Sequence, residues 1–149
     1  MTNILFVCTG NTCRSPIADA LLKSKALETI EVKSAGVFAS NGSDASEYTK
    51  QVLVEKGVPC DHQSTSLTEE LVDWASYIFT MTESHKQLIL ERFDFAKIKT
   101  FTLKEFVQQD ATDKNIDIID PFGGSVHLYR KTLEEIEPLI EELVRKIEN

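Results

Sequence analysis

The chain has 149 residues, of which 42% are hydrophobic and 27% charged, so we expect one folded domain over residues 1–149. Sixteen basic residues against twenty-four acidic ones give a net charge of -8, which disfavours binding to nucleic acid or to an anionic membrane. No apolar run approaches the ~20 residues of a membrane span, and the N-terminus lacks a signal-peptide pattern. The chain has three cysteines, which is a small and odd number for a disulfide scaffold, and this favours a cytoplasmic protein.

A continuous apolar run opens the chain at residues 3–7 and ends in a turn rich in Gly, Asn and Thr. Such a run is typical of a parallel strand that is buried on both faces. Pro16 then stands where a first helical turn would start, and apolar residues follow at helical spacing. These patterns predict a strand, a tight polar loop and a helix.

The same alternation continues after this first unit. Residues 30–34 predict a short strand, which Ala35 and Gly36 close. A helix follows, for which Asp44 or Ser46 is the N-cap and Gly57 ends the last turn.

Two further helices and two further strands are predicted in the middle of the chain. Residues 68–71 open a short helix with a capping signature, and residues 77–80 form the next strand. Thr82 caps a helix that runs through Phe93, and residues 98–101 form a fourth strand.

The last part of the chain predicts a loop and one long helix. A polar stretch at residues 108–117 leads to an apolar and Gly-rich segment at residues 118–124. An amphipathic helix follows, and we expect Pro138 to kink or divide it. Its predicted inner face consists of Leu128, Leu133, Ile136, Leu139, Ile140, Leu143 and Ile147. The alternation of strands and helices predicts a doubly wound α/β fold, with helices on both faces of a four-stranded, mostly parallel sheet.

Residues 8–15 carry the strongest chemical signal, because a cysteine, five residues and an arginine lie between a strand and a helix N-terminus. Gly10 permits unusual backbone angles, which let successive N–H groups turn inward around an anion. The helix dipole adds positive potential, and Arg14 supplies a planar fork for two phosphoryl oxygens. The loop therefore predicts a cradle for a dianion of about phosphate size.

Cys8 would lie at the floor of this cradle, where positive surroundings favour the thiolate, the reactive form of cysteine. Ser15 can donate a hydrogen bond to that thiolate. An isolated cysteine at the end of a strand is usually a small buried hydrophobic residue. Here it coincides with Gly10, Arg14 and Pro16 at their expected places, which indicates a nucleophile.

These residues resemble a known family. Cys8 followed after five residues by Arg14, Ser15 and Pro16, with Asp120 before a proline late in the chain, resembles the low-molecular-weight protein-tyrosine phosphatases. The resemblance extends over essentially the whole chain in length, motif placement and element order.

Within that family, the loop looks most like that of the bacterial protein-arginine phosphatases. Thr12 stands where tyrosine-specific members usually carry an aliphatic residue. Those members also tend to carry an aromatic pair where this chain has Phe122 and Gly123. The resemblance therefore implies a phosphatase that acts on phosphoarginine in proteins through a phosphocysteine intermediate.

The resemblance also implies roles for single residues. Asp120, which alone would be an ordinary turn aspartate, becomes the general acid and then the base that activates water. Asn11 and Ser34 are expected to hold the loop through hydrogen bonds, and His62 either joins them or is an exposed bystander. The residues that we expect to bind substrate are Thr9, Gly10, Asn11, Thr12, Cys13, Ser15, Phe38 and Phe122, with Phe106 as a further wall.

Cys13 leaves two interpretations open. It either forms a reversible disulfide with Cys8 that protects the thiolate from overoxidation, or it packs as a thiol under the loop. The remaining Cys60, His85 and His127 match no metal-binding spacing. We therefore expect neither a metal nor a cofactor.

The sequence has four candidate functions. A phosphoarginine phosphatase is favoured, because the Thr12 hydroxyl and Asp120 can contact a guanidinium. A phosphotyrosine phosphatase on the same scaffold is the alternative. An arsenate reductase fits poorly, because it needs two more cysteines and none follows Cys60. A non-catalytic phosphate-binding or redox-sensing module would be expected to lack Cys8 or Asp120. The expected partner is a phosphorylated protein, and the expected state is a monomer.

Overall fold

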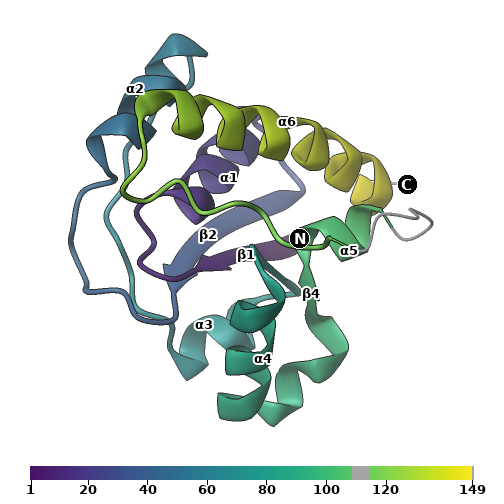
Figure 1. Ribbon diagram of the computed structural model, residues 1–149. Helices are drawn as coiled ribbons and strands as arrows, with labels where there is room; N and C mark the ends of the chain where they lie inside the picture. The colour runs from purple at the N-terminus through teal and green to yellow at the C-terminus, as the bar shows by residue number, and fades with distance from the viewer. Residues whose placement is uncertain (109–114, 149) are drawn as a thin grey trace.

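A computed structural model describes residues 1–108 and 115–148, and in this part of the chain four strands form one central sheet (Figure 1). The strands are β1 (Thr2–Cys8), β2 (Ile30–Gly36), β3 (Tyr77–Thr80) and β4 (Thr100–Thr102). Their order is β2-β1-β3-β4, and all three neighbouring pairs are parallel. The predicted doubly wound α/β fold is confirmed, and this sheet is parallel throughout.

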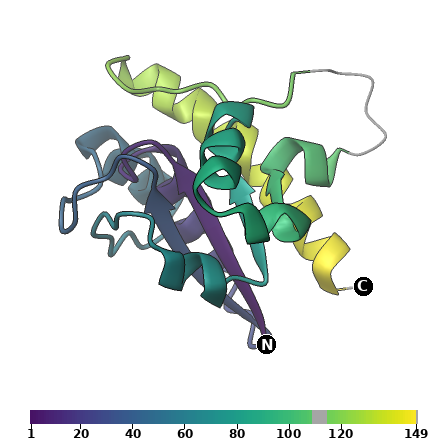
Figure 2. The same ribbon diagram turned by 90° about the horizontal axis from the view of Figure 1, so that it is seen from below.

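Helices cover both faces of the sheet, as Figures 1 and 2 show. On one face lie α1 (Arg14–Lys23), α2 (Glu47–Glu55), α5 (Leu103–Val107) and α6 (Val126–Glu148). On the other face lie α3 (Glu69–Trp74), α4 (Glu83–Arg92) and the 3₁₀ helix η1 (Asp94–Lys99). Alternate residues of β1 enter opposite cores, with Ile4 and Phe6 in one and Leu5 and Val7 in the other. This explains the continuous apolar run that opens the chain.

The strand order places the carboxyl end of β1 where the order of the strands reverses. The chain leaves β1 for β2 on one side and later returns to β3 on the other side. In open α/β sheets, ligands bind beyond the carboxyl ends of the strands where the order reverses. Cys8 is the last residue of β1 and lies at this point.

Several element boundaries differ from the predictions. The predicted strand over residues 98–101 is wrong at its start, because Ile98 lies in η1 and is 89% exposed. Helix α5 was not predicted, although Thr102 and Glu105 form a capping box at its start. Helix α1 begins at Arg14, and Pro16 lies in its first turn, where a missing N–H costs no hydrogen bond.

The C-terminal helix α6 is not divided at Pro138, which is exposed. Its apolar face packs against α1, α2 and α5. Five of the predicted inner residues are buried, whereas Leu128 and Ile147 are half-buried. Within residues 1–108 and 115–148, no helix is both long and apolar enough to span a membrane. Of the predicted polar loop, residues 109–114 lie outside the described part of the chain.

Candidate active site

The loop between β1 and α1 turns its carbonyl groups outward. The carbonyl oxygens of Cys8, Thr9, Asn11 and Thr12 accept hydrogen bonds from Val37 N, Phe38 N, His62 Nε2 and Ser46 N, respectively. In a trans peptide the N–H points away from the carbonyl, and no cis bond occurs in the described residues. The N–H groups that follow these carbonyls are therefore directed to the inner side of the loop. Such an arrangement suits an anion nest.

The left-handed backbone position in this loop belongs to Asn11, with a φ of 58°, and not to Gly10. The prediction that Gly10 supplies the unusual angles is therefore wrong. A Cβ at Gly10 would meet only Thr12 Oγ1, at 3.8 Å. Asparagine tolerates the left-handed region better than most residues, and here its side chain is also fully buried and hydrogen-bonded.

The Asn11 amide orients Ser15, whose hydroxyl lies beside Cys8. Its Oδ1 accepts a hydrogen bond from Thr65 N at 2.9 Å, which establishes which side of the amide is the donor. Its Nδ2 donates to Ser15 Oγ at 2.8 Å and to Ser34 Oγ at 3.0 Å. Ser15 Oγ lies 2.8 Å from Cys8 Sγ. Since Ser15 already accepts from Asn11, its own proton is available to donate to the sulfur.

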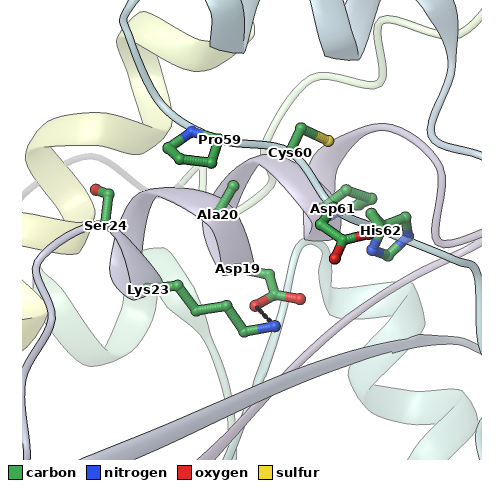
Figure 3. A pocket seen from close by; sticks show the side chains of 9 residues that line it. Asp19, Ala20, Lys23, Ser24, Pro59, Cys60, Asp61 and His62 are labelled. Atoms are coloured by element: carbon green, nitrogen blue, oxygen red, sulfur yellow. Dashed lines mark ion pairs between the residues drawn. The ribbon is translucent and has the colours of Figure 1, made fainter.

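The same network continues along α1 to Asp19, which lines the pocket drawn in Figure 3 together with Lys23 and His62. Ser34 Oγ donates to Asp19 Oδ2 at 3.0 Å, and Asp19 forms an ion pair with Lys23 at 3.0 Å. His62 Nε2 donates to the Asn11 carbonyl at 2.7 Å, so His62 joins the network and is not a bystander. The expected hydrogen bonds of Asn11 and Ser34 are confirmed. Asp19 was missed, although an acid on the buried side of α1 was a signal.

Arg14 and Asp120 form an ion pair beside the loop. The Arg14 side chain is buried, and its Nη1 donates to the Ile118 carbonyl at 2.9 Å. Its Nη2 lies 3.6 Å from Asp120 Oδ2, while Asp120 Oδ1 accepts from Phe122 N at 3.0 Å. Half of the Asp120 side chain is exposed, so it can contact both a ligand and water.

These groups surround one cavity of about 250 Å³. Its lining consists of Cys8, Thr9, Gly10, Thr12, Cys13, Arg14, Asp120 and Phe122. The structure thus brings together the three predicted catalytic residues and five of the predicted substrate-binding residues. Asn11 and Ser15 are buried behind the loop and support it from there.

The three predicted aromatic walls have different positions. Phe122 lines the cavity and is 77% exposed. Phe38 is also exposed and lies beside the loop, where its N–H donates to the Thr9 carbonyl, but it is not part of the lining. Phe106 packs on Phe79, with ring centroids 4.9 Å apart, in the aromatic part of the core. The prediction that Phe106 forms a wall of the cavity is wrong, because its ring packs on the sheet in the core.

Cys13 is a buried free thiol on the cavity lining. Its Sγ lies 3.4 Å from Tyr129 Oη and 3.8 Å from Ser46 Oγ. Burial, together with the hydrogen bond to Cys13, raises the pKa of Tyr129 to about 12, so the phenol stays protonated. The disulfide between Cys8 and Cys13 remains a prediction.

Two residues near the loop were missed. His85 on α4 is buried, and its Nε2 lies 2.8 Å from Thr9 Oγ1. Burial and the charge of Arg14 lower the pKa of His85 to about 4, so the imidazole is neutral at neutral pH. At Gly36, a Cβ would collide with the Thr9 carbonyl and lie 2.9 Å from Asn11 N. The glycine that closes β2 therefore lets the loop pack against that strand.

Comparisons with known proteins agree with this geometry. The family described as low molecular weight phosphotyrosine protein phosphatase matches residues 3–149. A protein-arginine-phosphatase of Geobacillus stearothermophilus is 55% identical over 145 residues, which cover 97% of this chain and 95% of that protein. The solved structure of YwlE arginine phosphatase from that organism has a TM-score of 0.95 at 53% identity, and the match covers 99% of this chain and 94% of that one.

A further solved structure bears on the prediction that Cys8 is the nucleophile. It is described as a YwlE arginine phosphatase mutant in which a cysteine is replaced by serine, with a phosphorylated active-site serine. It has a TM-score of 0.92 at 42% identity, and the match covers 99% of this chain and 97% of that one.

Proposed function

The chain belongs to the low molecular weight phosphotyrosine protein phosphatase family, and we propose that it hydrolyses phosphoarginine on protein substrates through a phosphocysteine at Cys8. The observation that carries this proposal is the shared cavity, which holds Cys8, Arg14 and Asp120 together with the hydroxyl-bearing Thr12. A relative named protein-arginine-phosphatase, 55% identical over nearly the whole chain, supports the same substrate class.

The first half of the reaction transfers the phosphoryl group to the enzyme. The inner N–H groups of the loop and the Arg14 guanidinium hold the phosphoryl oxygens. The Cys8 thiolate attacks phosphorus, so that an S–P bond forms while the P–N bond of phosphoarginine breaks. Asp120 donates a proton to the departing nitrogen, which keeps the electron pair of the P–N bond and becomes an NH₂ group of the arginine guanidinium. Ser15 donates its hydrogen bond to the sulfur while the thiolate charge is present.

The second half releases inorganic phosphate. Asp120, now a carboxylate, takes a proton from a water molecule that attacks phosphorus. A P–O bond forms, the S–P bond breaks, and the electron pair returns to Cys8 as the thiolate. Arg14 stabilises the charge on the phosphoryl oxygens in both halves, since its fork is held in place by the Ile118 carbonyl.

The cavity walls favour a guanidinium over a phenyl ring. A guanidinium carries N–H donors, which can meet the Thr12 hydroxyl and the oxygen of Asp120 that does not carry the proton. A phenyl ring is best held between apolar or aromatic walls, and among the residues that the structure describes Phe122 is the one aromatic residue on this lining. Phosphotyrosine is the second candidate, because Phe122 offers a single face for such a ring.

Kinetics on matched peptides test this function. One peptide carries phosphoarginine and the other carries phosphotyrosine at the same position, and kcat/KM is measured for both by release of inorganic phosphate. We expect a larger kcat/KM on the phosphoarginine peptide. A larger value on the phosphotyrosine peptide would move the second candidate into first place.

The cysteine usage supports a cytoplasmic location, where thiols stay reduced.

A further inference from the structure

His85 lies outside the reaction steps described above, yet it touches the loop that carries the nucleophile. It is 4% exposed, and its position on α4 is set by the Thr82 cap, whose side chain accepts a hydrogen bond from the His85 N–H. Its Nε2 lies 2.8 Å from the Oγ1 of Thr9, the residue directly after Cys8. In the part of the chain that the structure describes, the Thr9 hydroxyl is the one hydrogen-bond partner of this buried ring.

The ring's other nitrogen indicates where the proton lies. Nδ1 of His85 is buried and has no hydrogen-bond partner within residues 1–108 and 115–148. A buried N–H without an acceptor is rarer in proteins than a buried acceptor without a donor. The neutral imidazole therefore carries its proton on Nε2 and donates it to Thr9 Oγ1. The low pKa of His85, about 4, agrees with a single proton on the ring.

This tautomer leaves the Thr9 hydroxyl with a free proton. Thr9 Oγ1 accepts from His85, so its own O–H can donate elsewhere. Thr9 lines the cavity beside Cys8, and its carbonyl is held by Phe38 N at 2.9 Å. With the main chain held, the hydrogen bond from His85 restricts the remaining side-chain torsion. The cavity is filled during the reaction by a phosphoryl group, whose oxygens accept hydrogen bonds.

We propose that His85 is a positioning residue, which holds Thr9 so that the Thr9 hydroxyl donates a hydrogen bond to the phosphoryl group. The proposal rests on the proposed function only in that a phosphoryl group occupies the cavity. It applies equally to a phosphoarginine and to an aryl phosphate, because the contact is with the group that both substrates share. Thr9 becomes a contact of the transferred group, and His85 acts through Thr9.

Four variants test this arrangement. Thr9→Val removes the hydroxyl and keeps the branched shape, and His85→Phe removes the donor and keeps a ring. His85→Gln retains an N–H donor near the position of Nε2. The fourth variant combines Thr9→Val with His85→Phe. A hydrogen bond to a charged group corresponds to about a tenfold or larger effect on binding or rate. We expect kcat/KM on para-nitrophenyl phosphate to fall about tenfold in each phenylalanine or valine variant.

The double variant is the decisive comparison. If His85 acts through Thr9, His85→Phe adds less than about a twofold loss once Thr9 is valine. His85→Gln should restore most of the activity. The inhibition constant of inorganic phosphate should rise about tenfold in Thr9→Val and in His85→Phe, because product binding uses the same contact. His127→Phe replaces an exposed histidine on α6 and serves as the matched control, with unchanged kinetics.

Two results would overturn the proposal. One is a double variant whose loss equals the product of the two single losses. The other is an unchanged inhibition constant for phosphate in His85→Phe, with circular dichroism showing that the variant is folded. Because para-nitrophenyl phosphate and inorganic phosphate are used, these measurements keep their meaning even if the protein prefers phosphotyrosine. A failure of the phosphoarginine assignment is therefore distinguishable from a failure of this one.

Discussion

Nη2 of Arg14 lies 3.6 Å from Oδ2 of Asp120, so the first helix and the segment before the last helix meet at one cavity. In the proposed mechanism, Arg14 binds the phosphoryl oxygens and Asp120 transfers protons, so the ion pair places these two groups side by side. Because Asp120 is half exposed, this pair adds little to stability and can separate as a substrate enters. A substitution of either residue should therefore change the surroundings of the other.

The first prediction concerns Cys8→Ser. Serine keeps the loop and Arg14 but removes the thiolate, so we expect phosphate binding to persist while kcat falls by about 10⁴-fold or more. Phosphate release by the purified variant gives kcat, and calorimetric titration with inorganic phosphate gives its affinity. Substantial turnover in a clean preparation of Cys8→Ser would disprove the covalent mechanism.

Arg14→Lys should be nearly as damaging as Arg14→Ala. An ammonium is a point charge and does not reproduce the planar fork that spans two phosphoryl oxygens. Loss of such a preorganised donor costs about 2.7–4 kcal/mol, or about 10²–10³ in rate. Arg130→Lys, at the exposed pair with Glu55, is the matched control and should leave kcat/KM unchanged. More than half of the activity in Arg14→Lys would contradict the bidentate role.

Thr12→Ile should change the substrate preference. Isoleucine removes the polar contact for a guanidinium and adds apolar wall for a ring, so the ratio of kcat/KM on phosphoarginine to that on phosphotyrosine should fall. The loss on phosphoarginine should exceed the gain on phosphotyrosine, since added methylenes contribute only ~1–3 kcal/mol. Thr12→Ser keeps the hydroxyl and should keep the ratio. An unchanged ratio in Thr12→Ile would show that this side chain only fills space.

Peroxide should inactivate the enzyme reversibly, and Cys13 should be the reason. If Cys13 forms a disulfide with oxidised Cys8, a thiol reductant restores activity to the wild type but not to Cys13→Ser. Cys60→Ser serves as the control and should recover like the wild type. Activity after peroxide and after reductant is the measurement. Equal recovery in the wild type and in Cys13→Ser would leave Cys13 as a packing residue.

His85 makes stability depend on pH in a defined window. Its pKa is about 4 in the folded protein and near 6.5 when exposed, so the unfolded chain binds more protons between these values. The free energy of unfolding should therefore fall as the pH drops from 6.5 towards 4, by about 3 kcal/mol at about 1.4 kcal/mol for each unit of pKa. Urea unfolding at several pH values measures this. His85→Phe should lose less over this window than His127→Phe, and equal slopes would contradict the assignment.

The parts of the fold and site that were predictable depend on local sequence. The strand, loop and helix around Cys8 lie within one short segment, where apolar spacing, Arg14 and Pro16 specify the geometry together. Four parallel strands followed from the same alternation. Ile98 was misplaced because four residues with apolar side chains only at 98 and 101 do not distinguish a strand from a 3₁₀ turn.

The remaining features depend on contacts between distant segments. His85 reaches Thr9 from α4, and Asp19 reaches Ser34 across the gap between α1 and β2. Periodicity indicates which face of an element is buried, but the partner on that face depends on packing and strand register. Asp120 was assigned by resemblance alone, because nothing local distinguishes it from a turn aspartate.

The central claim is that this cavity selects phosphoarginine, and competition within one protein tests it most directly. A substrate protein that carries phosphoarginine and phosphotyrosine at separate sites is incubated with the enzyme, and mass spectrometry follows the occupancy of each site with time. The ratio of the two decay constants gives the ratio of kcat/KM without separate calibration. We expect phosphoarginine to disappear first, with Cys8→Ser leaving both sites intact. Faster loss of phosphotyrosine would contradict the claim.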